Sequence, residues 1–510
     1  MALSNRGIFL KRFTGLVRSY HERSTTSVAS SRDDKQLHEI PGPTGLPVVG
    51  NLFQFLSYAM KGKAHLYHQD LSRKFGDFYK ITILGESQVI ISDPDLIEDI
   101  FRKEIKTPKR PSNPSWDDYR FDNNQEHGLL TSFAEEWQKN RSALNKQMLR
   151  PKNVNQYCEE LSGIVSDLIT RFELIAEPLG EKAGAEGVFI HNLSNELYKW
   201  SLESISSVMF ETRLGCLKEP VDPKIQNFID NINSMWYTTV LLYAAYGMQR
   251  KFKTKYYKRH MENWDVIFQV ARENIERRTK ELEMAGPDDR ASAFLTRLLL
   301  NKDLSQGALV SNVAELLMAA VDTTSNTTCF MLFNLANNEK VQQKLYDEIK
   351  STVGVDGVID VRKLEQMDYL KMCLKENYRM FPVAPINARI LTTAQRINGY
   401  IIPKDTLTVF SHYTSCRNSK YFHDPEEFIP ERWSRTDGDI IHPFASLPFG
   451  HGSRSCIGRR FAELELKLGL IQILRKFEVK PHKTMVLNPF YRTILSPGKE
   501  VPIVFHRRDA

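Results

Sequence analysis

The stretch Leu447–Arg460, LPFGHGSRSCIGRR, holds one cysteine among three glycines and three arginines. A thiol in this setting has four possible roles: half of a disulfide, a zinc ligand, a nucleophile, or a ligand to another cofactor. The role of Cys456 decides what the rest of the chain is built to hold.

The spacing of the cysteines argues against two of these roles. The six cysteines lie at 158, 216, 329, 373, 416 and 456, and no CxxC pair occurs. Scattered cysteines in a long chain are typical of reduced, mostly buried thiols. Zinc needs clustered ligands. A core cysteine, a nucleophile and a haem ligand therefore stay open for Cys456.

The residues around Cys456 favour a stabilised thiolate. A helix is expected to start directly after it, and the positive end of a helix dipole favours a negative sulfur. Gly450, Gly452 and Gly458 remove side-chain bulk, so that backbone N–H groups and a flat ligand can come close. Arg454 adds a cation. A nucleophile would need a general base, and the sequence does not assign that role to His451. Such a loop suits a thiolate-ligated haem.

Length and composition bound the architecture. A chain of 510 residues would usually form two or three domains. However, no Gly/Ser linker, repeat or low-complexity block divides it after about residue 60. We therefore predict one large, mainly α domain with a minor β part, over 36–510.

Periodicity predicts helices at 134–149, 154–175, 190–210, 256–283, 305–336, 339–352 and 364–380. Apolar alternation around a Gly-Glu-Ser turn predicts a hairpin in FYKITILGESQVIISDP, and Asp93 is expected to cap a helix that starts at Pro94. Short strands are expected between 382 and 450 and at the end of the chain.

The N-terminal segment 1–35 is predicted to be a mitochondrial transit peptide, because it is rich in Arg and Ser and has apolar residues at helical spacing. Residues 1–32 carry six basic side chains against one acidic one, so the net charge of +7 belongs mostly to this segment. The charge is thus no argument for nucleic-acid binding. A disordered basic tail is the alternative. No apolar run reaches the length of a membrane span.

The helix predicted at 305–336 carries candidate residues for proton transfer. Polar residues Asp322 to Thr328 interrupt an apolar helix, where the Thr323 hydroxyl can bond back to the Ala319 carbonyl and bend the helix. An acid beside that hydroxyl would make a proton-delivery pair.

The other candidates are paired charges and donors. Glu376 and Arg379 share one helix face, which is commonly a surface ion pair, and Lys371 and Lys375 share another face. Trp137 and Arg141 could grip a carboxylate together or simply stack.

The run Phe449-Gly450-x-Gly452-x-Arg454-x-Cys456-x-Gly458 resembles the haem-binding signature of the cytochrome P450 superfamily. Four further elements occur in the family's order and spacing, and the resemblance covers about residues 36–510. The four elements are Trp137/Arg141, Asp322-Thr323, Glu376/Arg379 and Arg432.

The resemblance implies a cofactor and a role for each residue. Cys456 would be the axial iron ligand of haem b, next to Gly458, with Phe449 shielding its sulfur. The haem propionates would be held by Trp137, Arg141, Arg389 and Arg454. A buried network would consist of Glu376, Arg379 and Arg432. As catalytic residues, Asp322 and Thr323 would steer protons to bound O2, and one oxygen atom would enter a C–H bond.

The segments CIGRRFAELE and RSALNKQMLRPKNV resemble the animal mitochondrial branch. No dinucleotide-binding GxGxxG, flavin domain or iron–sulfur cysteine set is present, so electrons must come from a partner. The resemblance implies a mitochondrial 2Fe-2S ferredoxin that docks at Lys371 and Lys375, supplied by its reductase and NADPH. The chain departs from the family's usual Gly at Ala320, which implies a tuned oxygen site.

The same branch implies a sterol, steroid or secosteroid substrate. Apolar pocket walls are expected at 107–130 (with Trp116 and Tyr119), 235–239, 319–323, 383–387 and 490–495. The segment 240–259 is expected to contact the matrix side of the inner membrane peripherally, or to be a buried helix junction. A xenobiotic-oxidising mitochondrial monooxygenase, a haem-thiolate isomerase that needs no redox partner, and a non-catalytic haem protein are the alternatives.

Overall fold

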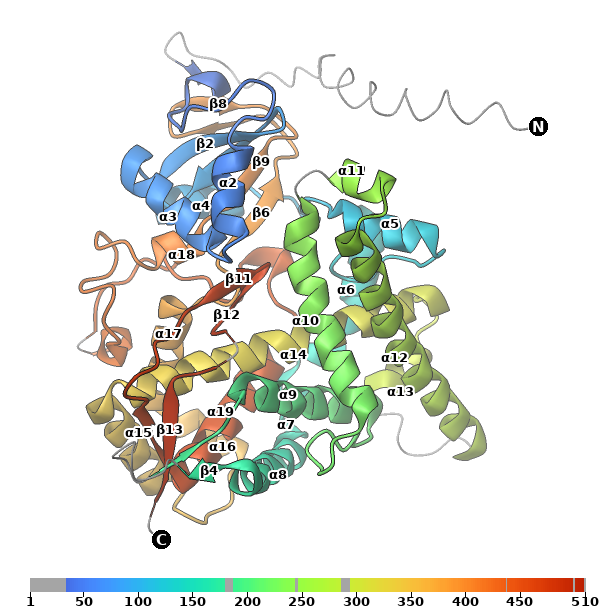
Figure 1. Ribbon diagram of the computed structural model, residues 1–510, viewed down its shortest axis with the longest axis vertical. Coiled ribbons are helices and arrows are strands. Elements are labelled where there is room, and N and C mark those ends of the chain that lie inside the picture. Colours follow the sequence, from blue (N-terminus) through green and yellow to red (C-terminus); the bar gives the residue numbers. More distant parts are fainter. Residues whose placement is uncertain are drawn as a thin grey trace.

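A large helical body and a smaller sheet-rich part make up the protein (Figure 1). The computed structural model describes residues 34–178, 187–243, 246–285, 294–436, 438–498 and 500–508. The expected transit peptide therefore lies almost wholly outside the described residues. At its end, Lys35 pairs with Tyr400 in a parallel strand pair. The mainly α fold with minor β that the sequence predicts is confirmed.

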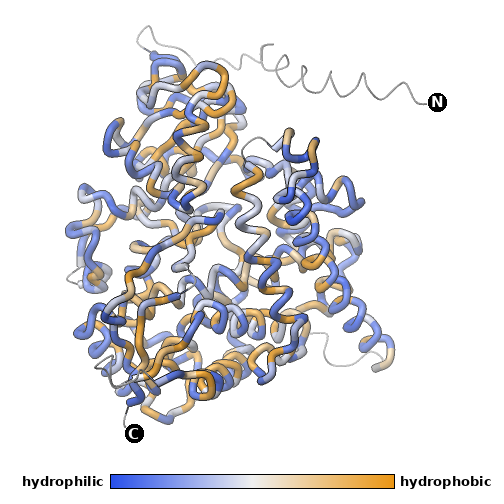
Figure 2. The backbone as a smooth tube through the Cα atoms, in the orientation of Figure 1, coloured by the Kyte–Doolittle hydropathy of each residue, from blue (hydrophilic) through white to orange (hydrophobic). Residues whose placement is uncertain are grey.

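The helices are as follows: α2 Leu52–Ala59, α3 Ala64–Phe75, α4 Pro94–Arg102, α5 Pro114–Asp122, α6 Ala134–Met148, α7 Pro151–Asn155, α8 Cys158–Ile175, α9 Leu193–Phe210, α10 Pro223–Tyr243, α11 Tyr246–Lys251, α12 Lys255–Ala285, α13 Phe294–Leu299, α14 Gln306–Ala336, α15 Glu339–Thr352, α16 Val361–Gln366, α17 Asp368–Met380, α18 His412–Ser415 and α19 Arg459–Lys476. Hydrophobic and hydrophilic stretches alternate along most of them (Figure 2), as expected for helices that bury one face.

Two predicted helices are each divided in two. The prediction at 154–175 is interrupted between α7 and α8, and the prediction at 364–380 is interrupted at Met367. In the second case the first turn of α17 is capped from another helix. The Glu348 carboxylate on α15 accepts the N–H groups of Tyr369 and Leu370 at 2.7 and 2.9 Å. Because this cap comes from a distant residue, local sequence could not reveal it.

The strands form four small sheets in the described residues. Their orders are β2–β3–β9–β6, β1–β8–β7, β10–β13–β5–β4 and β11–β12. The bounds are β1 Lys35–Gln36, β2 Phe78–Ile83, β3 Glu86–Ile91, β4 Glu177–Pro178, β5 Val188–Phe189, β6 Asn387–Ile390, β7 Gln395–Ile397, β8 Tyr400–Ile402, β9 Leu407–Phe410, β10 Phe477–Pro481, β11 Phe490–Arg492, β12 Ile494–Ser496 and β13 Ile503–Arg507.

The predicted hairpin is present as β2 and β3, but its turn lies earlier than expected. Leu84 and Gly85 form the turn with φ values of 54° and 85°, and Glu86 already pairs with Ile83. Both turn residues have positive φ, as in the two-residue turns that match the twist of a hairpin. The predicted cap is confirmed, since Asp93 accepts the N–H groups of Asp95 and Leu96.

Helix α14 forms the centre of the body, where it packs against α9, α12, α17 and α19 (Figure 1). Almost all of its residues are buried, including a run of Ser, Thr and Asn. Several hydroxyls in this run donate to the carbonyl four residues earlier, so that they need no water. None of the described helices is long and apolar enough to cross a membrane.

Candidate active site

The loop before α19 closes on itself around Cys456. The Cys456 N–H donates to the Phe449 carbonyl at 2.8 Å. Gly450 and Gly452 have φ values of 68° and 70°, a conformation that side chains with a Cβ rarely adopt. Two of the three glycines are therefore required by the backbone, whereas Gly458 caps α19 and donates its N–H to the Cys456 sulfur.

The Cys456 thiol differs from the other five cysteines, which are buried, because its side chain is exposed. Protein atoms nevertheless surround it closely enough that desolvation raises its pKa. The Gly458 N–H and the guanidinium groups of Arg141 and Arg110 lower this pKa, but by less than desolvation raises it. The loop therefore contributes groups that favour a thiolate, as expected, while burial opposes them. A coordinated metal ion would supply the missing stabilisation.

Four arginines gather beside this loop and form an arginine cluster: Arg110, Arg141, Arg389 and Arg454. Glu104, which pairs with Arg389, is the carboxylate that faces them. Burial and mutual repulsion lower the pKa of Arg454 to about 9 and that of Arg110 to about 10. So large an excess of buried positive charge requires an anionic ligand.

The individual contacts of the cluster support such a ligand. The Arg454 guanidinium stacks 4.0 Å from the Trp137 ring centroid, and its Nη1 is buried without a partner. One interpretation of the sequence was that Arg141 stacks on Trp137, but the structure shows Arg454 in that place. The Nη1 of Arg141 instead donates to the Ser455 carbonyl at 2.8 Å. The exposed thiol of Cys456, the unpartnered Nη1 of Arg454 and the excess positive charge of the arginine cluster together fit a haem, which carries two carboxylates.

Arg110 is the member of the cluster that sequence reasoning missed. Its Nη2 donates to the Arg454 carbonyl at 2.7 Å and so ties the segment before α5 to the cysteine loop. In the sequence, the only indication of this role was that Arg110 is a basic residue within the segment 107–130, which was expected to form a wall of the pocket.

Two residues on α14, Asp322 and Thr323, were expected to form a proton-delivery pair, and the structure agrees with that prediction for Thr323 only. The Thr323 hydroxyl donates to the Ala319 carbonyl at 2.8 Å, as expected. Ala319, Ala320 and Thr323 remain partly accessible on an otherwise buried stretch of helix, so they share a face that borders internal space. Asp322 is fully buried and bonds to Arg492 instead of Thr323.

The charges of the predicted network are buried and fully paired. Arg379 donates two hydrogen bonds to Glu376, at 2.8 and 3.0 Å, and Arg432 donates a third at 3.0 Å. All three side chains have zero exposure, which excludes the surface ion pair that the spacing alone allowed. The Trp433 indole N–H and the Ile429 N–H also donate to Glu376.

Comparison with known proteins identifies the family. The profile of the Cytochrome P450 family matches residues 40–504. The chain belongs to the cytochrome P450 family. It is 36% identical over 482 residues to the mitochondrial 25-hydroxyvitamin D-1 alpha hydroxylase of Mus musculus, covering 92% of this chain and 93% of the relative.

Two further mitochondrial relatives cover a similar share. The sterol 26-hydroxylase of Rattus norvegicus is 34% identical, over 93% of this chain and 90% of the relative. The 1,25-dihydroxyvitamin D(3) 24-hydroxylase of the same species is 30% identical over the same shares. Cytochromes P450 hold haem through a cysteine thiolate, and this chain is a cytochrome P450 monooxygenase.

The expected pocket walls of this P450 are joined by hydrogen bonds. The Trp116 indole N–H donates to the Thr239 hydroxyl at 2.9 Å, which links α5 to α10. The Leu495 N–H donates to the Val383 carbonyl at 2.8 Å, which links β12 to the 383–387 segment. Tyr119 was expected in the same wall, but it packs on Trp264 and donates to Asp265 on α12.

The predicted docking lysines of this P450 line a surface hollow of about 810 Å³ next to the cysteine loop. Five basic residues line it and form the basic hollow: Lys371, Lys375, Arg435, Arg459 and Lys467. Burial, then repulsion by Arg435 and Arg459, lowers the pKa of Lys375. Lys371 pairs with Asp368 at 2.8 Å.

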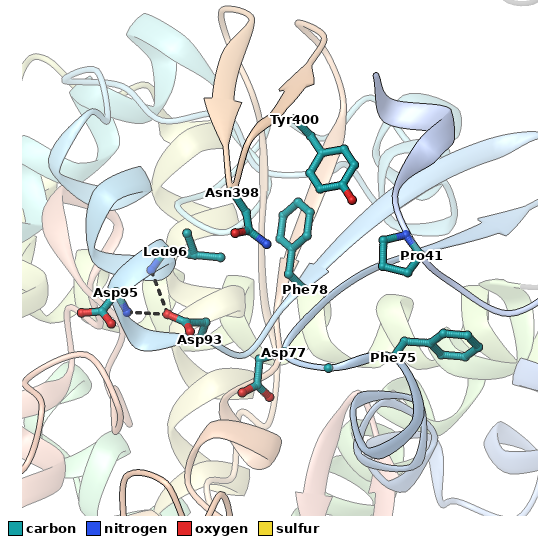
Figure 3. A pocket seen from close by; sticks show the side chains of 10 residues that line it. Pro41, Phe75, Asp77, Phe78, Asp93, Asp95, Leu96, Asn398 and Tyr400 are labelled. Atoms are coloured by element: carbon teal, nitrogen blue, oxygen red, sulfur yellow. Dashed lines mark hydrogen bonds between the residues drawn. The ribbon is translucent and has the colours of Figure 1, made fainter. Parts of the chain in front are cut away.

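A second cavity, of about 530 Å³, lies beside the small sheets (Figure 3). Its aromatic residues Phe78 and Tyr400 stack on each other, and Asp93 is occupied as the cap of α4. Asp77 accepts the hydroxyls of Ser72 and Ser92. These side chains are therefore engaged within the protein, and none of them is among the expected haem-binding residues.

Proposed function

We propose that this cytochrome P450 hydroxylates a sterol, steroid or secosteroid in the mitochondrion, with electrons from a 2Fe-2S ferredoxin. The observation that carries the proposal is the combination of an accessible thiol, Cys456, with the arginine cluster beside it. This donor set matches the two ends of a haem, an iron that takes a thiolate and propionates that take cations.

Each residue of the site has a proposed task. Cys456 would ligate the iron, and the Gly458 N–H would moderate the charge on its sulfur. The propionates would lie among Trp137 and the arginine cluster, where they would satisfy the Arg454 Nη1. When bound, the haem supplies activation of O2. Thr323 would hold a proton within reach of the bound oxygen, and Asp322 would supply it.

The substrate class rests on the relatives and on the walls of the pocket. Two relatives are named as vitamin D hydroxylases and one as a sterol hydroxylase. Buried wall residues such as Trp116, Met235 and Leu495 suit a large lipophilic molecule.

The electron donor is inferred from the basic hollow. It lies on the side of Phe449, Gly450 and His451, which belong to the cysteine loop. An acidic protein docked there would stand next to the thiolate ligand, which gives electrons a short route. Lys371 and Lys375 would form part of that contact.

Peripheral membrane contact is supported by exposed apolar side chains around α11. Tyr243, Met248 and Phe252 are 51%, 61% and 71% exposed, and Arg250, Lys251, Lys253 and Lys255 lie between and beside them. Exposed apolar residues within a basic segment suit the surface of an anionic membrane. Together with the leader predicted at 1–35, these side chains support the proposal that the enzyme lies on the matrix side of the inner membrane.

The test combines spectra with turnover. The reduced protein under CO is expected to show a thiolate-type Soret band, and Cys456→Ser is expected to abolish it. A panel of sterols, secosteroids and foreign compounds is then screened for the low-to-high-spin shift, and hits are turned over with ferredoxin, its reductase and NADPH. Turnover of foreign compounds alone, or product formed without reductant, would overturn the proposed substrate or reaction. No thiolate-type band in the wild type would overturn the haem assignment.

A further inference from the structure

One lysine of the basic hollow has no carboxylate to pair with. The two carboxylates that line the hollow are both engaged, since Asp368 pairs with Lys371 and Glu463 pairs with Arg459, each at 2.8 Å. Within the described residues, the ammonium group of Lys375 forms neither an ion pair nor a hydrogen bond. Its charge is therefore uncompensated in the part of the chain that the structure describes.

The position of Lys375 combines access with a lowered pKa. Its side chain reaches solvent, and its Nζ lies 5.6 Å from the centroid of the Trp433 ring, which lines the same hollow. Protein atoms surround it closely enough that desolvation lowers its pKa, and repulsion by Arg435, Arg459 and Lys371 lowers it further. An amine that is partly desolvated beside other cations is more often neutral, and the neutral amine is the nucleophile.

The two other lysines of the hollow lack this combination. Lys371 pairs with Asp368 and also donates to the Glu365 carbonyl. Lys467 is half-buried, and although burial lowers its pKa, Glu463 and Glu365 raise it. The hollow therefore distinguishes one amine from its neighbours.

The hollow also has the volume and the charge to bind a phosphate-bearing molecule. Its volume of about 810 Å³ is that of a small-molecule site. Guanidinium groups bind phosphate with two parallel hydrogen bonds, and Arg435 forms no ion pair within the described part of the chain. Arg435 and Arg459 both lie close enough to Lys375 to repel its charge. A phosphate held by these arginines would therefore lie near the amine.

We propose that Lys375 is an acylation site, and that the basic hollow binds the phosphate groups of the acyl thioester that modifies it. The neutral amine attacks the thioester carbonyl, and a C–N bond forms. The C–S bond breaks with its electron pair on sulfur, and the proton that the amine loses passes to the thiolate. The products are an amide and a free thiol, so that the hollow loses one positive charge.

Acylation of Lys375 would weaken the docking of ferredoxin. This consequence rests on the proposed function, in which Lys371 and Lys375 contact an acidic redox partner. The cations that attract such a partner also attract phosphate, so the thioester and ferredoxin would compete for one surface. Loss of the Lys375 charge would then lower the affinity for ferredoxin after the thiol has left.

The test incubates the purified haem protein with acetyl-coenzyme A at about pH 8, where a lysine of lowered pKa is partly neutral. Peptide mass spectrometry follows the acetylation of each lysine over time. Lys375 should react about tenfold faster than Lys371 and the exposed Lys340, as expected for a more neutral amine beside a bound reagent. S-acetyl-N-acetylcysteamine, a thioester without phosphate, should show a smaller preference.

The variant Arg435→Gln/Arg459→Gln tests the phosphate contacts. The ratio of the two rates at Lys375, with acetyl-coenzyme A over the phosphate-free thioester, should fall by about tenfold. Lys340→Gln/Lys350→Gln removes the same amount of charge at exposed positions of α15 and should leave this ratio unchanged. Asp368→Asn should speed the acetylation of Lys371, because it removes the ion pair.

Two outcomes would overturn the inference. One is acetylation of Lys375 at the rate of Lys340, and the other is an unchanged ratio of rates in Arg435→Gln/Arg459→Gln. A separate readout concerns docking: pretreatment with acetyl-coenzyme A should raise the KM for ferredoxin several-fold in the wild type but not in Lys375→Arg, which keeps the charge. Rapid acetylation of Lys375 with an unchanged KM would support the acylation site and overturn the docking contact in the proposed function.

Discussion

Arg432 Nε lies 3.0 Å from Glu376 Oε1, although 56 residues separate them, and neither side chain has any exposure. Glu376 thus pairs with two buried guanidinium groups, that of Arg379 on the same helix α17 and that of Arg432 on the 3-10 helix η5, Pro430–Trp433. Its removal would leave Arg379 without its carboxylate partner and Arg432 with only the partly exposed Asp439, 3.2 Å from its Nη1.

Glu376→Gln is expected to destabilise the folded protein by about 3–5 kcal/mol, the usual cost of breaking a buried ion pair. The measurement is chemical unfolding together with the haem content of the purified protein. Glu365→Gln changes an exposed residue on the neighbouring helix α16 and should have almost no effect. Equal stability of the two variants would contradict the role of the network.

Arg110→Gln should have opposite effects on the apo and holo proteins. Without haem, removal of one cation relieves repulsion in the arginine cluster and should raise thermal stability. With haem, it removes a charge-assisted contact, so haem transfer to an acceptor protein should be about tenfold faster. Arg150→Gln, at an exposed position, is the control. Unchanged haem transfer would show that Arg110 does not contact the propionates.

The double variant Lys371→Gln/Lys375→Gln should raise the KM for ferredoxin several-fold and weaken its salt dependence, with little change in kcat. Steady-state kinetics at several salt concentrations test this. Lys340→Gln/Lys350→Gln, at two exposed positions of α15, is the control that removes the same amount of charge. Peroxide-supported turnover should stay the same, since it needs no docking. A KM that does not change would exclude these lysines from the contact.

Met248→Ser/Phe252→Ser should reduce binding to vesicles of phosphatidylcholine and an anionic phospholipid by at least about tenfold. Each apolar side chain contributes about 1.5–3 kcal/mol when it is fully buried. Co-sedimentation measures the loss. Met284→Ser is the control, because this methionine is 80% exposed but lies at the opposite end of α12. If both variants bind as the wild type does, the membrane contact lies elsewhere.

Glu465 on α19 predicts a pH dependence of stability. Burial raises its pKa to about 8, and Ser201 and Ser204 lower it only in part. Since the unfolded chain ionises this carboxyl near its ordinary value of 4.5, the folded state binds an extra proton between these values. The free energy of unfolding therefore falls as the pH rises, by at most about 4 kcal/mol between pH 5 and pH 8.

Glu465→Gln should remove this loss, so that the variant is more stable than the wild type at pH 8 and similar at pH 5. Thermal unfolding at both pH values measures the difference. Glu463→Gln alters a carboxylate on the same helix that pairs with Arg459 near the surface, and it should show no such crossover. Parallel pH curves for the wild type and Glu465→Gln would contradict the assignment.

The features of this protein that depend on local geometry could be predicted from the amino-acid sequence. The bond from Thr323 to the Ala319 carbonyl follows from helical i, i+4 spacing. The cysteine loop needs Gly450 and Gly452 for its positive φ values, and Asp93 caps the helix that starts at Pro94. The family could be predicted because these local features carry its signature.

Which distant charges meet could be learned from the folded structure alone. It buried the Glu376–Arg379 pair, added Arg110 to the arginine cluster and turned Asp322 toward Arg492, 170 residues away. Spacing along a chain cannot show such contacts. Whether a charge is solvated or buried, and which partner compensates it, depends on how the helices and hairpins pack around it.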